Sequence, residues 1–179
     1  MVRWGSATLA AVAVGTIAGL GKHGQAQSAQ SVGIRLPRYV QSLTAEVRPA
    51  RATVGQTVNL TLLLTVAPDF HVNANKPDDP NLIPTEVKLL VPKGVAFTVG
   101  TPRFPSAETL SVGYSDKPVK VYEGATTITV PVTVKKGAKA GTVALSGDVH
   151  LQGCNQTACY PPATLHFSAP LVVSTPEKP

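Results

Sequence analysis

The sequence predicts an all-β domain, an immunoglobulin-like antiparallel β-sandwich preceded by a signal peptide. The 179-residue chain contains 16 prolines and 15 glycines but only 5% aromatic residues, proportions that suit many turns better than long helices. From Leu43 to Val173 the chain shows seven to nine short β-type runs without helical periodicity, as expected of a two-sheet sandwich. This length accommodates one ordinary domain with little room for a second.

The first 26 residues have the features of a secretory signal peptide. Arg3 provides a positive start, and residues 7–21 form an apolar run that is short for a membrane span. Gly24 and Ala26 place small residues where a signal peptidase requires them, so we expect cleavage after Ala26. An uncleaved N-terminal anchor is the alternative. We therefore expect a periplasmic or secreted protein, in a compartment where a disulfide persists, with no membrane span in the mature chain.

Residues 27–42 are polar with little periodicity and are expected to be a flexible lead-in. The domain is expected over residues 43–174, followed by a tail at 175–179. In residues 57–65 an alternating pattern becomes continuously apolar, as in a core strand, and residues 92–94 form a turn signal. Further strands are expected at residues 86–91, 95–99, 119–122, 126–134, 142–151 and 163–173.

The expected strand at residues 126–134 is amphipathic. Its branched apolar residues share one face, while the threonines and Pro131 share the other, which indicates a half-buried strand. Proline cannot donate a backbone hydrogen bond, so Pro131 suggests that this strand lies near a sheet edge. The apolar residues on the inner face are Ile128, Val130, Val132 and Val134.

The charge of the mature chain does not indicate a nucleic-acid partner. Loss of Arg3 and Lys22 with the leader leaves 14 of the 16 basic residues against 10 acidic ones. The only tight basic group, Lys135, Lys136 and Lys139, is typical of a solvated turn. A nucleic-acid site would require basic residues gathered on one face.

The only two cysteines, Cys154 and Cys159, lie in the segment GCNQTACYPP at residues 153–162. A disulfide closing so short a loop contributes about 2 kcal/mol, against about 4–5 kcal/mol for a hundred-residue loop. Thiol–disulfide exchange, in contrast, requires that the freed cysteine stay close enough to resolve a mixed disulfide. The comparison of these energies leans towards exchange without settling it, and the spacing alone slightly favours a structural or incidental bridge.

The neighbours of the cysteines suggest an accessible position. Gly153 allows another backbone to approach closely. The segment Tyr160-Pro161-Pro162 cannot continue an ordinary ladder, because its two prolines lack backbone donors. We therefore expect the cysteines at the end or edge of a sheet, although a plain loop would look the same.

The segment GCNQTACYPP resembles the active-site segment of the N-terminal periplasmic domain of the DsbD thiol:disulfide interchange family. Other segments match the family in the same order, and the resemblance covers roughly residues 44–174. One departure is Phe70, where related sequences often carry tryptophan. The matching segments are Asp69-Phe70-His71-Val72, Pro77-x-Asp79, Leu82-Ile83-Pro84-Thr85, Pro92-x-Gly94-Val95, Pro102 or Pro105, and Tyr122-Glu123-Gly124.

The resemblance implies a thiol–disulfide oxidoreductase of the protein-disulfide reductase type. A thioredoxin-like protein or membrane electron transporter, expected on a separate chain, would reduce the disulfide, and the dithiol would then reduce periplasmic client proteins. Cys159 would form the mixed disulfide with partners and Cys154 would resolve it. The resemblance also implies an aromatic cap, for which Tyr114 is the first candidate and Phe104 the second. His71 and Tyr160 are expected near the pair, without a cofactor or metal.

Other functions are supported less well by the sequence. His150, Cys154, Cys159 and His166 could be read as zinc ligands, but zinc needs four ligands that converge, and the strand positions of these residues do not favour that. No nucleophile-elbow motif or carboxylate pair suggests a hydrolase. The remaining rival is an immunoglobulin-like binding or assembly module in which the disulfide is only a local clamp.

Overall fold

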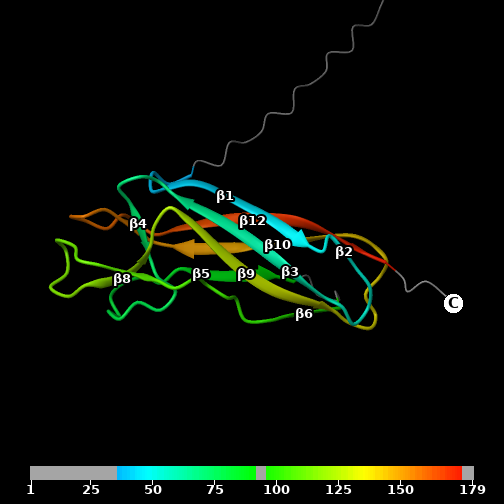
Figure 1. Ribbon diagram of the computed structural model, residues 1–179. Helices are drawn as coiled ribbons and strands as arrows, with labels where there is room; N and C mark the ends of the chain where they lie inside the picture. Colours follow the sequence, from blue (N-terminus) through cyan, green and yellow to red (C-terminus); the bar gives the residue numbers. More distant parts are fainter. Residues whose placement is uncertain (1–35, 92–95, 175–179) are drawn as a thin grey trace, which may run out of the picture. The chain divides into compact units, whose positions relative to one another are not determined.

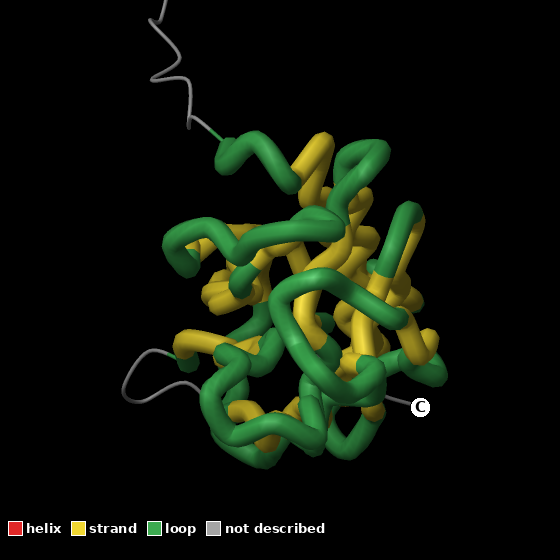
Figure 2. The backbone as a smooth tube through the Cα atoms, turned by 90° about the vertical axis from the view of Figure 1, so that its left-hand side faces the viewer, coloured by secondary structure: helices red, strands yellow, loops and turns green. Residues whose placement is uncertain are grey.

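The computed structural model describes residues 36–91 and 96–174, so the expected signal peptide, the tail and most of the lead-in lie outside the described residues. Every regular element within these two ranges is a β-strand, as Figures 1 and 2 show. None of the described residues forms a helix long and apolar enough to cross a membrane. The strands are β1 (Val40–Arg48), β2 (Arg51–Ala52), β3 (Thr57–Val66), β4 (His71–Asn73), β5 (Glu86–Leu90), β6 (Phe97–Val99), β7 (Glu108–Leu110), β8 (Val119–Tyr122), β9 (Ala125–Val134), β10 (Gly141–Leu151), β11 (Gly153–Cys154) and β12 (Ala163–Val173).

Two four-stranded sheets form the sandwich. One has the order β1-β3-β9-β6, and the other has the order β2-β12-β10-β5. Their strands pair antiparallel, except that the short β2 runs parallel to β12. Apolar residues from both sheets, including Leu62 and Leu171, belong to one buried core. The prediction of an all-β, immunoglobulin-like sandwich is confirmed.

Strand β9 follows its predicted pattern. Ile128, Val130, Val132 and Val134 are fully buried, because alternate side chains of a strand point to the same face. Strand β9 lies next to the short edge strand β6, whose pairing with it ends at Val99 opposite Val132. Pro131 therefore lies just beyond the end of β6, on a strand one position in from the sheet edge, in agreement with the prediction; Gly100 N still donates to Pro131 O at 2.8 Å.

Two expectations about the N-terminal half are wrong. Leu63 interrupts the continuous core expected in residues 57–65, because β3 keeps its alternation and leaves Leu63 39% exposed on the outer face. The lead-in is also shorter than expected. Strand β1 begins at Val40, and Tyr39 is only 1% exposed, so residues 39–42 belong to the folded domain. The difference arises because the Tyr39 ring is buried in the domain. The mostly polar sequence around Tyr39 gave no indication of this burial.

A third antiparallel sheet, with the order β11-β4-β8-β7, carries the cysteines at its edge. Its strands have only two to four residues, too few for a periodic signal in the sequence. Val72 of β4 and Tyr122 of β8 join it to the main core, and a second small core forms around Val112, Val119 and Val121. Figure 2 shows that loops and turns gather at this end of the domain.

The alternation in β3 yields a prediction for two adjacent leucines. We expect Leu62→Ala to lower the free energy of unfolding by about 2–5 kcal/mol, because it leaves a cavity in the core. The control, Leu63→Ala, should cost less than about 1 kcal/mol, because its side chain lies on the outer face. Urea unfolding followed by far-UV circular dichroism measures both, and equal losses would contradict the observed register.

Candidate functional site

Cys154 and Cys159 face each other across a tight hairpin and are joined by a disulfide. Their Cα atoms are 3.9 Å apart, and the two residues form an antiparallel bridge. The flanking backbone bonds run from Tyr160 N to Gly153 O and from Asn155 N to Ala158 O, each 2.9 Å long. The cysteines thus occupy a non-hydrogen-bonded pair, the position at which opposing Cα atoms come closest in an antiparallel ladder.

The turn between the cysteines is held by its own side chains. The Asn155 Oδ1 atom accepts hydrogen bonds from the backbone N–H groups of Thr157 and Ala158, at 3.0 and 2.8 Å. This Asx turn is a typical use of asparagine in a tight loop. Asn155 Nδ2 also donates to the Tyr160 hydroxyl at 3.2 Å. Hydrogen bonds therefore hold the two cysteines together in addition to the disulfide.

The two cysteines differ in exposure. Cys154 is completely buried, whereas Cys159 is partly exposed. Cys154 lies on β11, the edge strand of the third sheet, which agrees with the expected sheet edge. A molecule that approaches from solvent therefore meets Cys159 first.

Tyr39 packs directly against the hairpin, although sequence reasoning placed it outside the domain. A Cβ atom on Gly153 would lie 2.1–2.6 Å from three atoms of the Tyr39 ring, so only glycine fits there. The Tyr39 hydroxyl donates to the Pro161 carbonyl at 3.0 Å. Burial raises the pKa of this phenol, which keeps it protonated as a donor. The sequence signal for this contact is Gly153 itself, although the three atoms nearest to its Cβ position belong to an aromatic ring instead of the expected neighbouring backbone.

The base of the hairpin is tied to β4 and to an aromatic cluster. Gln152 Nε2 donates to the Tyr160 carbonyl at 3.1 Å, and Gln152 Oε1 accepts from Asn73 Nδ2 at 3.2 Å. The Tyr160 ring packs edge-on against Phe70, with 5.6 Å between the ring centroids. The Arg38 guanidinium lies 5.4 Å from the centroid of the Tyr160 ring. The structure thus places Tyr160 beside the disulfide and fixes its ring.

His71 lies directly across the ladder from Cys154. The two residues are register partners between β4 and β11, so their side chains share one face of the sheet. His71 is 2% exposed, and burial lowers the pKa of its imidazole, which is therefore neutral at pH 7. Its Nε2 atom lies 2.7 Å from the Tyr114 hydroxyl, and the two rings stack with 6.1 Å between centroids. Cys154, His71 and Tyr114 thus form a continuous group.

Residues 111–118, between β7 and β8, form a loop that lies against the hairpin, and Figure 1 shows both at the same end of the sheets. Gly113 N donates to Gln156 O at 2.8 Å, and Gln156 Nε2 donates to Ser111 O at 2.9 Å. This 111–118 loop carries Tyr114, the first candidate for the cap. Phe104, the second candidate, stacks on Tyr122 with 6.1 Å between centroids and packs against the main core. The structure therefore favours Tyr114 over Phe104 at the site.

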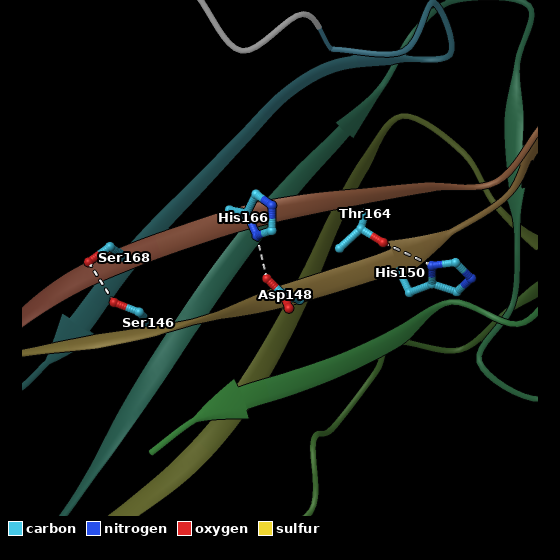
Figure 3. Close-up of polar contacts among 6 residues, drawn as sticks. All are labelled: Ser146, Asp148, His150, Thr164, His166 and Ser168. Atoms are coloured by element: carbon cyan, nitrogen blue, oxygen red, sulfur yellow. Dashed lines mark hydrogen bonds and ion pairs between the residues drawn. The ribbon is translucent and has the colours of Figure 1, made fainter. Parts of the chain in front are cut away.

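The four candidate zinc ligands, His150, Cys154, Cys159 and His166, do not converge on one point. His150 pairs with Thr164, and His166 pairs with Asp148, across the outer face of β10 and β12 (Figure 3). Both cysteines are used in the disulfide. Within residues 36–91 and 96–174 no group of three or more histidine, cysteine, aspartate or glutamate residues could hold a metal ion. The surface histidines belong to a row of exposed polar pairs that includes Ser146 and Ser168.

Comparison with solved structures finds distant likenesses. The N-terminal periplasmic domain of ScsB from Proteus mirabilis shares 15% identity over 73% of this chain, with a TM-score of 0.46. The chain covers only 44% of that structure's length. The DsbD N-terminal domain of Neisseria meningitidis in its reduced form shares 21% identity, with a TM-score of 0.43, over 74% of this chain and 87% of that one. No curated protein sequence matches the chain.

The family comparison is more informative because it covers most of the chain. The profile of the family described as "Thiol:disulfide interchange protein DsbD, N-terminal" matches residues 40–170. This range begins at the first residue of β1 and includes the hairpin, His71 and the 111–118 loop. The chain belongs to the DsbD N-terminal domain family, a family of thiol–disulfide interchange domains.

Proposed function

We propose that this domain is a periplasmic thiol–disulfide oxidoreductase that relays electrons through Cys154 and Cys159. The donor would be a thioredoxin-like protein or a membrane electron transporter on a separate chain, and the acceptors would be disulfide-containing client proteins. The observation that carries the proposal is the difference in exposure within a closely held pair, with Cys154 buried and Cys159 partly exposed. The signal peptide predicted at residues 1–26 and the membership of the family support the periplasmic location.

The proposed relay uses two exchange steps. A thiolate of the donor attacks Cys159 Sγ, the Cys154–Cys159 bond breaks, and Cys154 leaves as a thiolate that takes up a proton. The second donor thiolate then attacks the sulfur of the first donor cysteine in the mixed disulfide, and Cys159 leaves as a thiolate that also takes up a proton. The donor dithiol is thereby oxidised to a disulfide, and the domain gains two electrons and two protons. The same steps in reverse order reduce a client.

The local structure supports this division of roles. Because Cys159 is the exposed member of the pair, it is the sulfur that a docking protein reaches first. Cys154 stays on β11, held opposite His71, while the bond to Cys159 is broken. The hairpin hydrogen bonds keep the freed sulfur close, which is what resolution of a mixed disulfide needs. In this proposal the 111–118 loop, with Tyr114, shields the pair until a partner displaces it.

The first prediction concerns which sulfur bonds to a partner. Cys154→Ala retains the exposed thiol, so we expect it to form a stable mixed disulfide with a single-cysteine thioredoxin-like protein activated as its thionitrobenzoate derivative. Cys159→Ala is the matched control and should react at least about tenfold more slowly, because its remaining thiol is buried. Non-reducing electrophoresis and intact mass measure the adducts. If neither variant forms one, the relay is wrong and the rival binding module is favoured.

The second prediction concerns the cost of opening the disulfide. Because the bond closes a six-residue loop whose ends are already hydrogen-bonded, reduction should lower the free energy of unfolding by only about 2 kcal/mol. Urea unfolding of the oxidised and reduced wild-type domain measures this without any substitution. We also expect a reduction potential above about −300 mV, measured against glutathione mixtures. A reduced domain that unfolds, or a far lower potential, would indicate a structural clamp.

A further inference from the structure

His71 is a buried polar residue that links two separate parts of the site. It belongs to β4, yet its imidazole is hydrogen-bonded to Tyr114 in the 111–118 loop, at 2.7 Å between Nε2 and the hydroxyl. From its position on β4, His71 is also the register partner of Cys154 on β11. Tyr114 itself is partly exposed and packs against the small core around Val112. The bond therefore connects the interior of the sheet beside the buried cysteine to a loop that reaches solvent.

The other contacts of the 111–118 loop with the site are made to the tip of the hairpin. Gly113 N and Ser111 O are both bonded to Gln156, at 2.8 and 2.9 Å. Gln156 is exposed and lies within the turn between the cysteines. A docking protein that displaces the turn would compete directly with these bonds. The bond between His71 and Tyr114 is instead anchored to β4, which also pairs with β8.

We propose that His71 is a positioning residue that holds the 111–118 loop closed over the disulfide through its bond to Tyr114, and that protonation of His71 opens the loop. The proposal rests on the proposed function, because it assigns a control to the same disulfide. The step is a proton uptake from water by the imidazole, with no change in the oxidation state of the sulfurs. Closed, the loop limits access to Cys159; open, it admits a reductant.

The direction of the pH effect follows from burial. With the loop closed, burial lowers the pKa of His71, whereas in an open, hydrated state the pKa returns to about 6.5. Above that pH the imidazole is neutral in both states, so the closed state keeps its full stability. As the pH falls below about 6.5 the open state binds the proton first, and the closed state loses stability.

No neighbouring charge offsets this effect. The elements next to His71 carry five charged residues, and all five are exposed: Asp69 in the preceding turn, Asp116 and Lys117 in the 111–118 loop, Lys120 on β8 and Glu123 directly after it. Tyr114 is uncharged, because burial raises the pKa of its phenol. Cys154 does not titrate while it is in the disulfide. Burial alone causes the shift in the pKa of His71.

The test measures how fast a small phosphine reduces the disulfide of the mature domain. At pH 7.5, Tyr114→Phe and His71→Gln should each be reduced about fivefold faster than wild type, the factor that corresponds to one ordinary hydrogen bond. The double variant should be reduced no faster than either single variant, because both remove the same bond. The matched control is Tyr122→Phe, which loses only bonds to Asn75, a residue outside both the hairpin and the 111–118 loop; its rate should equal that of wild type.

The pH profile distinguishes this role from a purely structural one. The ratio of the wild-type rate to the His71→Gln rate cancels the titration of the phosphine, and it should rise towards one between pH 7.5 and pH 5. Additive effects of the two substitutions, unchanged rates, or a flat ratio would each overturn the proposal. If His71→Gln does not fold, Tyr114→Phe can replace it in the ratio. If the rates follow these expectations while Cys154→Ala traps no thioredoxin-like protein, that result would support the role of His71 and show that only the proposed relay has failed.

Discussion

A two-residue antiparallel ladder between β11 and β4 determines where the chemistry of this domain lies. It sets Gly153 opposite Val72 and Cys154 opposite His71. Opposing residues of a ladder share one face, so the buried sulfur and the imidazole cannot be moved apart without breaking the sheet. The ladder depends in turn on the absence of a side chain at Gly153, because the Tyr39 ring occupies the space that a Cβ atom would need.

Stability and reactivity are supplied by different parts of the domain. The apolar core between the two large sheets includes fully buried leucines such as Leu60 and Leu62, which stabilise the fold far from the hairpin. The hairpin is held by backbone bonds, by the Asx turn of Asn155 and by Tyr39. None of these contacts is made by the sulfur atoms, which is the arrangement that the proposed opening and closing of the disulfide requires.

The histidines of the domain show how burial decides the role of a residue type. His150 and His166 form pairs with Thr164 and Asp148 on the outer face of β10 and β12, where water screens the interaction and such pairs contribute little. His71 makes a single bond to Tyr114, but in a buried place next to Cys154. There a proton on the imidazole is costly, so the protonation state of His71 is coupled to the position of the 111–118 loop.

Local patterns in the sequence were sufficient for the long strands β3, β9, β10 and β12 and for the cysteine pair, but not for β1. Alternation over nine or more residues fixes which face of β9 is buried, and a spacing of five limits the disulfide to a small loop. Resemblance to the DsbD family, rather than periodicity, pointed to His71, Tyr160 and the cap. Tyr39 was missed, because a single aromatic residue in a polar stretch carries no periodic signal.

Only the tertiary structure decided the exposure of Leu63, the difference in burial between Cys154 and Cys159, and the choice of Tyr114 over Phe104 at the site. The physical reason is the same in each case. The sequence determines what a short segment prefers locally, whereas burial and hydrogen-bond partners depend on which distant segments pack against it. Strands as short as β4 and β11 have almost no local preference, so the site they build exists only once the large sheets have brought them together.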